Sequence, residues 1–140
     1  SALEIVTLLK DVHHPRARST IVKLIAGLEG AAPDAGLKSM FRHLAQALMT
    51  HMDEEELVVF PAVDRSARGL HVDKAEFIDA IAFLEFGHGE IGRMEATLRE
   101  EAHQFGGLAA PLVHFLDELE AHSVLEDQVL VPLLKALVPE

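Results

Sequence analysis

One motif occurs twice in this sequence, and the repeat constrains the fold more than any other feature. Each copy has the pattern His-x3-Glu-x5-Pro, and the second copy follows the first by 71 residues at every shared position. Residues four apart lie one above the other on an α-helix, so His51 meets Glu55 and His122 meets Glu126. An imidazole beside a carboxylate is a natural arrangement for a divalent metal. The repeat therefore predicts a metal-binding helical bundle.

The rest of the chain also has helical periodicity, with no alternating runs typical of strands. Apolar residues make up 49% of the 140 residues, so residues 1–140 are expected to form one folded domain. We expect four helices, approximately at 2–29, 37–64, 73–103 and 109–137. Short connections favour an all-α, up-down-up-down four-helix bundle. The constant offset further predicts two helical hairpins related by a pseudo-twofold repeat.

Local signals refine these expected helices. Pro15 is expected to kink or restart the first helix, and Pro61 to disturb the second. Asp73 with Glu76 is predicted to cap the third helix, which should stop before two glycines at 106–107. The first connection is expected at residues 30–36 and the second at 65–72.

Composition excludes several kinds of function. The net charge is −11, from 23 acidic and 12 basic residues, which argues against nucleic acid and anionic membranes as partners. The chain has no Cys, so disulfides, thiolate zinc sites and Cys-ligated iron–sulfur clusters are excluded. The absence of Tyr and Trp leaves no side chain suited to a stable aromatic radical. No apolar run is long enough to span a membrane and no signal-peptide pattern occurs, so a cytoplasmic protein is expected.

Each His-x3-Glu helix needs a partner helix to complete the coordination of a metal. The third helix offers His88, and the first offers His14, which we favour over its neighbour His13 because its face continues to Ile21. Four imidazoles and two carboxylates suit two metal ions better than one. Mixed ligands of this kind favour iron, with zinc and manganese as alternatives. The predicted metal ligands are His14, His51, Glu55, His88, His122 and Glu126.

Other polar residues are assigned lesser roles. His43 and His114 lie eight residues before the repeated histidines, which rotates them by about 80° and places them near the surface. Both glutamates next to Glu55, namely Glu54 and Glu56, are expected to be solvated. A ferritin-like site would need a Glu-x-x-His motif on two different helices; the motif ending at His88 lies on the third helix, and none lies on the second or fourth. The site is therefore expected to be histidine-rich.

Three glycines surround His88, at positions 87, 89 and 92. Each costs roughly 0.5–1 kcal/mol inside a helix relative to Ala, so local preference does not explain them. They indicate either close helix packing or a gap through which a small molecule enters. Gly92 lies one turn from His88 and is expected to face the site.

With these residues in place, the sequence resembles the hemerythrin-like (HHE cation-binding) family over nearly its whole length. The family has a histidine on the first and third helices and HxxxE on the second and fourth. HMDEEELVVFP and HSVLEDQVLVP are closest to the iron–sulfur cluster repair di-iron proteins of that family. The resemblance implies two iron ions in an oxo- and carboxylate-bridged centre. It also implies a reaction with nitric oxide, oxygen or peroxide in stress response or cluster repair.

The sequence departs from family patterns at several positions. Oxygen carriers have a second histidine where Gly92 stands, which makes reversible oxygen carriage a weaker expectation. They also use an aspartate at the place of Asp127, so Asp127 competes with Glu126 as a ligand. Gly87 and Ala17 replace residues typical of the repair proteins, whose Cys-bearing N-terminal segment has no counterpart here. The fold and the metal are therefore better supported by the resemblance than the repair activity.

Three classes of function remain open at this point. The first is a stress-related di-iron protein that acts on a diatomic molecule or peroxide. The second is an oxygen or redox sensor, an oxygen-binding module or a metal store without turnover. The third is a metal-free bundle whose histidines are satisfied in the core. Enzymatic turnover and the oligomeric state stay undecided.

Overall fold

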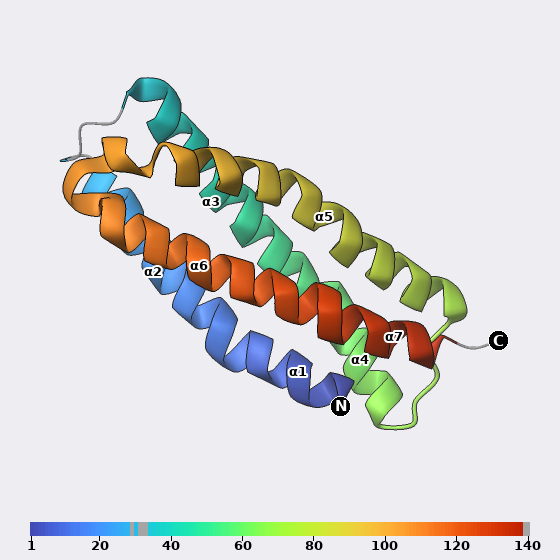
Figure 1. Ribbon diagram of the computed structural model, residues 1–140. Coiled ribbons are helices and arrows are strands. Elements are labelled where there is room, and N and C mark those ends of the chain that lie inside the picture. Colours follow the sequence, from blue (N-terminus) through green and yellow to red (C-terminus); the bar gives the residue numbers. More distant parts are fainter. Residues whose placement is uncertain (29, 31–33, 139–140) are drawn as a thin grey trace.

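The computed structural model describes residues 1–28, 30 and 34–138, which are almost entirely helical and contain no strand (Figure 1). The described elements, in chain order, are α1 (Ala2–Leu8), η1 (Leu9–His13), α2 (His14–Leu28), α3 (Ala35–Glu54), η2 (Glu55–Val59), α4 (Phe60–Ala67), α5 (Lys74–Glu100), η3 (Ala102–Leu108), α6 (Ala109–Leu125), η4 (Glu126–Leu130) and α7 (Val131–Leu137). They join into four long helical rods that pack side by side, so the expected all-helical bundle is confirmed (Figure 1).

The ends of the rods differ from the expected ones by a few residues. The second rod begins at Ala35 because the Asp34 side chain accepts a hydrogen bond from the Leu37 N–H at 2.8 Å. It continues to Ala67, beyond the predicted end at residue 64. The third rod ends at Glu100 and continues as the 3₁₀ turn η3. Of the expected connection at 30–36, residues 31–33 lie outside the described residues and residues 35–36 already belong to α3.

The predicted capping pair at the start of α5 is wrong. Asp73 does precede the helix, but its side chain makes no capping hydrogen bond. Its carboxylate instead lies 2.7 Å from Nε2 of His71, while Glu76 forms an ion pair with Arg65. Asp73 therefore contacts the connection that precedes α5, and Glu76 links α5 to α4.

Three of the elements, η1, η2 and η4, are single wide turns of π-helix. Each ends just before a proline, namely Pro15, Pro61 or Pro132. Proline has no N–H to donate, and its ring crowds the carbonyl four residues back. A wide turn relieves this crowding, because the residue before the proline bonds the carbonyl five residues back instead. These bonds run from His14 to Leu9, from Phe60 to Glu55 and from Val131 to Glu126.

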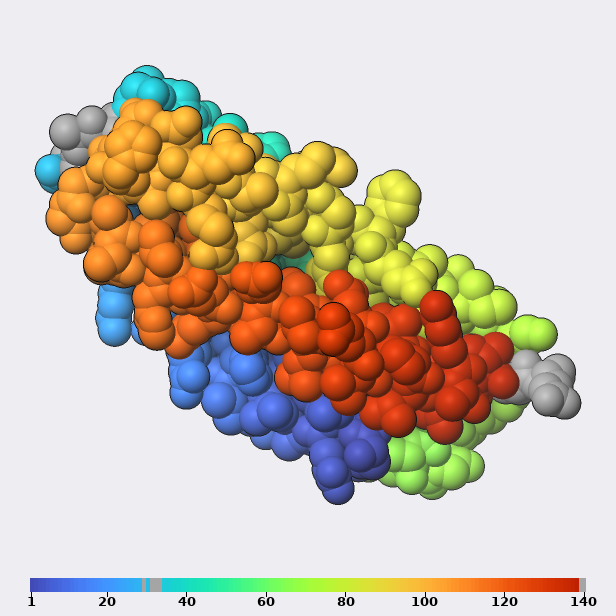
Figure 2. Space-filling view, viewed as in Figure 1, coloured from blue at the N-terminus to red at the C-terminus, as the bar shows by residue number. Residues whose placement is uncertain are grey.

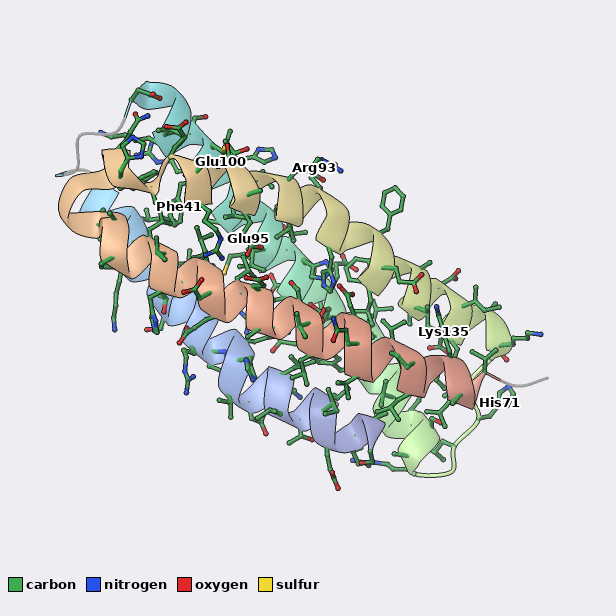
Figure 3. The ribbon with its side chains drawn as sticks, in the orientation of Figure 1. Phe41, His71, Arg93, Glu95, Glu100 and Lys135 are labelled. Carbon is green, nitrogen blue, oxygen red and sulfur yellow. The ribbon has the colours of Figure 1, made fainter. Side chains whose placement is uncertain are left out.

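The apolar core is divided into two parts. One cluster includes Phe41, Phe105 and Phe115, and Figure 3 shows Phe41 toward the end of the bundle where α2 and α3 meet. The other cluster includes Phe60 and Phe77 and lies toward the opposite end. Every rod contributes to both clusters, with an interval of seven to twelve residues between its buried members of one and of the other. The buried polar side chains lie within or beside this interval on three rods, so they form a layer across the bundle.

Candidate metal centre

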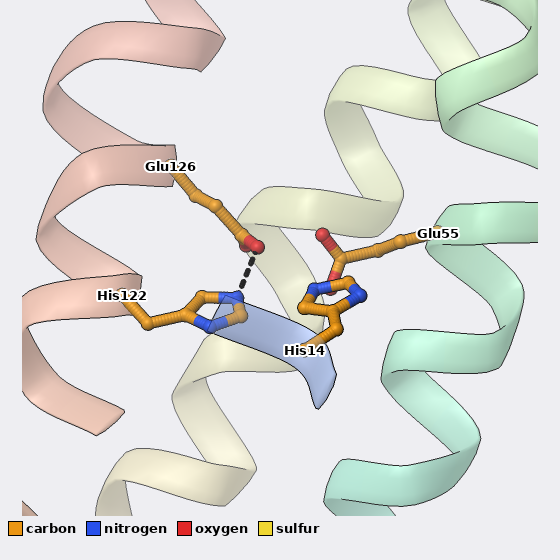
Figure 4. Close-up of side chains that lie close together, drawn as sticks. All are labelled: His14, Glu55, His122 and Glu126. Atoms are coloured by element: carbon orange, nitrogen blue, oxygen red, sulfur yellow. Dashed lines mark hydrogen bonds and ion pairs between the residues drawn. The ribbon is translucent and has the colours of Figure 1, made fainter. Parts of the chain in front are cut away.

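All six predicted ligands meet in the polar layer between the two cores. His14, Glu55, His122 and Glu126 form one group, and His51, His88 and Glu126 form another. Within each group, one ligand atom from every residue lies within 4.8 Å of the others. Figure 4 shows the first group, with Glu55 and Glu126 extending toward each other from facing helices.

Two copies of the same local structure supply most of these side chains. His51 lies in the last turn of α3, and Glu55 is the first residue of η2. His122 and Glu126 occupy the matching places in α6 and η4. Nε2 of His51 is 3.2 Å from Oε1 of Glu55, and Nε2 of His122 is 2.5 Å from Oε1 of Glu126. The repeated motif therefore produces two repeated imidazole–carboxylate pairs.

Glu126 joins the two groups. Its Oε1 faces Nε2 of His122, and its Oε2 lies 2.6 Å from Nε2 of His88. The two oxygens of one carboxylate thus face histidines of different groups. Held in this way, the Glu126 carboxylate would reach a cation in either group. Glu55 also lies near two histidines. Its Oε1 is 3.2 Å from Nε2 of His51 and 3.9 Å from Nε2 of His14.

Several buried ligand atoms have no hydrogen bond to any described residue. They include both ring nitrogens of His14, both carboxylate oxygens of Glu55 and Nε2 of His51. The short His51–Glu55 distance lacks the alignment that a hydrogen bond needs. A buried polar atom without a partner costs roughly 1–3 kcal/mol. A cation shared by these atoms would remove that cost, so the donor set fits a bound metal.

Burial and neighbouring charges shift the pKa values of the buried histidines and glutamates. Burial lowers the pKa of His14 and of His51 to about 4, so both rings are neutral at pH 7 and offer a free lone pair. Burial, together with the nearby Glu126, raises the pKa of Glu55 well above its ordinary value. Burial also acts to raise the pKa of Glu126, but hydrogen bonds with His122 and His88 hold it well below the usual range. One carboxylate is thus charged while its neighbour resists charging.

The sequence profile of the hemerythrin HHE cation binding domain matches residues 5–134 of this chain. The chain belongs to the hemerythrin HHE cation-binding family. The match includes all four rods and every predicted ligand. No curated protein and no solved structure gives a match. In the described part of this HHE domain, no helix is long and apolar enough to cross a membrane.

The alternative residues of this HHE domain differ in burial. His14 is fully buried in the layer, whereas His13 is partly exposed and contacts the His122 ring edge-on at 5.9 Å. Glu126 is also fully buried, but Asp127 is exposed. His43 and His114, which the sequence placed near the surface, are exposed there; they lie near Glu90 and Glu118 respectively.

Contacts around the ligands hold the rings in place. Asp127 lies 2.8 Å from Nδ1 of His88, the nitrogen that does not face Glu126. Such a carboxylate fixes the ring orientation and tautomer of a metal-binding histidine. On the other side, Glu56 lies 3.7 Å from Nδ1 of His14 and pairs with Arg18. The expectation that Glu56 is solvated is therefore wrong, and nothing in the motif pointed to Arg18.

Aromatic stacking also fixes two ligands. The His14 ring stacks on Phe60 with centroids 5.5 Å apart and on His122 at 5.0 Å. The His51 ring stacks on Phe83 at 4.8 Å. Beyond His51 lies Gly87, whose missing side chain leaves space for the ring. The glycine expected to face the site, Gly92, is instead exposed at the surface, so that expectation is wrong.

Two surface pockets reach the layer, one at each repeated histidine. The first has a volume of about 190 Å³ and is lined by His13, Arg16, Ala17, Phe115, Glu118, Leu119, Ala121 and His122. The second, more open, has a volume of about 290 Å³ and is lined by Ala47, Thr50, His51, Glu54, Phe83, Gly87, Glu90 and Ile91. Small molecules therefore have two separate approaches to the candidate ligands.

Proposed function

We propose that this HHE domain binds two iron ions, one in each of the two groups of ligands, with Glu126 shared between them. The observation that carries the proposal is the division of the Glu126 oxygens between His122 and His88. The unpaired buried atoms of His14 and Glu55 support it, because a cation would satisfy them. Zinc and manganese accept similar ligands, so metal analysis of the purified protein has to identify the bound ion.

We infer that the loaded domain reacts with nitric oxide, oxygen or peroxide in the cytoplasm, in stress response or iron–sulfur cluster repair. Iron supplies the redox chemistry for such a reaction when it is bound. The chain positions and protects the centre: Asp127 holds the His88 ring, and Phe60 and Phe83 stack against His14 and His51. The pocket beside His122 supplies an approach for a small molecule.

The same proposal includes the overall organisation. We infer one domain over residues 1–140, with up-down-up-down rods and two hairpins related by an approximate twofold axis. Equal 71-residue spacing supports this: η2 begins at Glu55 and η4 at Glu126, while α4 and α7 begin at Phe60 and Val131.

The test is metal analysis of protein purified without added metal, together with its optical spectrum. We expect two iron ions per chain and a visible absorption band that disappears on reduction and changes when nitric oxide is added. A shared ligand makes a sharper prediction. Glu126→Ala should lower metal content in both groups, whereas His14→Ala should affect mainly the group that contains His14. Full metal content in Glu126→Ala would contradict the shared site.

A further inference from the structure

The outer face of α5 carries an exposed phenylalanine that the metal centre does not use. Phe86 is 89% exposed, the highest value among the large exposed hydrophobic residues of the described chain. It lies on the side of α5 away from the helices that α5 packs against, α3, α6 and α7. Figure 2 shows α5 along one edge of the molecule. Exposed small residues, Ala82 and Gly89, lie one turn before and after Phe86.

Two unpaired charges flank Phe86 at equal distances on the same face. Asp79 lies seven residues before it and Arg93 seven residues after it, which is about 10.5 Å along the helix in each direction. Both are exposed, and neither has an ion-pair partner in the described part of the chain. The other charged neighbours, Glu85 and Glu90, have intramolecular contacts, at 2.8 Å with Lys135 and 3.7 Å with His43.

We propose that this face binds a second copy of the chain, with the two α5 helices antiparallel and a twofold axis at Phe86. The axis follows from the charges. Because Asp79 and Arg93 are equally far from Phe86, the axis places Asp79 of each copy opposite Arg93 of the other. The small side chains at positions 82 and 89 leave room for the second Phe86 ring. The face is thus complementary to itself, in a chain whose net charge of −11 otherwise opposes self-association.

The size of the face sets the strength of the dimer. The stretch from Asp79 to Arg93 is about 21 Å long and one helix wide. Interfaces of this size lie at the small, transient end of the range for protein complexes. The dimer is therefore weak and reversible, forming at high micromolar to millimolar concentration, and its formation does not depend on the bound metal.

The test is sedimentation velocity over a range from micromolar to millimolar protein, with charge-reversal variants. Asp79→Arg alone brings two arginines together at each contact, and Arg93→Asp alone brings two aspartates together, so each variant should stay monomeric. An equimolar mixture of the two variants should form a heterodimer, because every contact then pairs opposite charges. The double variant Asp79→Arg, Arg93→Asp should also dimerise.

Two control variants distinguish binding at this face from a general effect of surface charge or of exposed apolar area. Lys23→Asp makes the same change of charge as Arg93→Asp at an exposed position on α2, and Val22→Ala removes an apolar side chain that is 64% exposed. Both controls should dimerise like the wild type, whereas Phe86→Ala should not. A wild type that stays monomeric at millimolar concentration would overturn the proposal. So would a mixture of the two single variants that remains monomeric while both are folded by circular dichroism.

Discussion

Gly87 lies so close to His51 that a β-carbon at position 87 would stand 2.6 Å from both Cε1 and Nδ1 of the imidazole ring. Atoms do not approach this closely, so any larger residue must move the ring or the helix. The ring has little room to move, because Phe83 stacks on it. Gly87 thus determines where a candidate ligand on the neighbouring helix can lie.

This contact leads to a first prediction with a matched control. Gly87→Ala should lower metal affinity on the order of 10–100-fold, as typically seen when a contact that orients a ligand is lost. Gly92→Ala should keep full metal content and raise stability by about 0.5–1 kcal/mol, because a β-carbon there meets nothing within 4 Å. Metal titration and urea unfolding of both variants provide the measurements. Equal metal affinity in the two variants would show that the His51 position does not matter.

The second prediction tests the repeated histidines against their surface counterparts. His51→Ala and His122→Ala should each lose metal, because each removes a buried ligand from the polar layer. His43→Ala and His114→Ala should retain it, since both side chains are exposed. The measurement is the metal content per folded chain after gel filtration, compared among the four variants. Full occupancy in His122→Ala would exclude this ligand assignment.

The third prediction separates two adjacent residues on the first rod. His14→Ala should reduce metal content, whereas His13→Ala should leave it unchanged, because His13 contacts the His122 ring but lies outside both ligand groups. Comparison of iron and zinc content in the two variants is sufficient. A loss of metal in His13→Ala with the fold intact would reverse the assignment.

The fourth prediction concerns acid stability of the metal-free protein. The pKa of His14 is lowered from about 6.5 to about 4 in the folded state, mainly by burial. The unfolded chain therefore binds a proton first, and stability falls as the pH drops from about 6.5 to about 4. His14→Phe keeps a buried ring beside Phe60 but removes this titration.

We therefore expect the free energy of unfolding in urea to fall more between pH 7 and pH 4.5 in the wild type than in His14→Phe. The difference should be about 2–3 kcal/mol, from a shift of the pKa by roughly two and a half units. Both proteins are first freed of metal by a chelator. An equal decrease in the free energy of unfolding in the two proteins would mean that His14 is not held neutral by burial.

The fifth prediction compares the two pockets as approaches to the centre. Ala17→Leu fills the pocket beside His122, and Ala47→Leu fills the pocket beside His51. We expect Ala17→Leu to slow the reaction of the reduced, metal-loaded protein with nitric oxide, because that pocket is the more enclosed one. Stopped-flow absorption gives the rate, and metal analysis confirms equal loading. A slower reaction only in Ala47→Leu would identify the other pocket as the approach.

The bundle and the gathering of the six candidate ligands follow from signals along the sequence. Helical periodicity, prolines and glycines locate the rods, and the repeated motif places a histidine and a glutamate on one face of each of two helices. Burial also differs between neighbours: His14 and Glu126 are buried, whereas His13 is half-buried and Asp127 is exposed. These are local properties of single helices, which is why sequence patterns predict them.

Contacts between helices were harder to predict. The Arg18–Glu56 pair behind His14 joins residues 38 apart, and nothing in either segment marks the other. The sequence predicts that Gly92 faces the site, but the rotation of α5 against α3 instead brings Gly87 against His51 and leaves Gly92 at the surface. That rotation is set by packing of whole faces, such as Phe83 on His51.

The wide turns had a signal in the sequence. His122, Glu126, Leu130 and Leu134 are all buried and follow one another at a constant spacing of four. An α-helix turns by about 100° per residue, so a residue four positions along points about 40° away from the first. After three such steps the side chain has left the original face of the helix. A buried series at this spacing therefore needs a wider turn, and the proline that follows makes one favourable.

The same wide turns change how these helices would respond to a change of length. Deleting one residue between Glu55 and Phe60 would replace the wide turn by an ordinary α-helical turn, so the helix beyond it would keep nearly the same orientation. Val63 would stay buried, but the proline ring at Pro61 would again crowd the carbonyl four residues back. Surface loops commonly absorb insertions and deletions. In this chain a wide turn gives the inside of a helix the same tolerance, and comparison of relatives should find the glutamate-to-proline segment one residue shorter only where the proline is replaced.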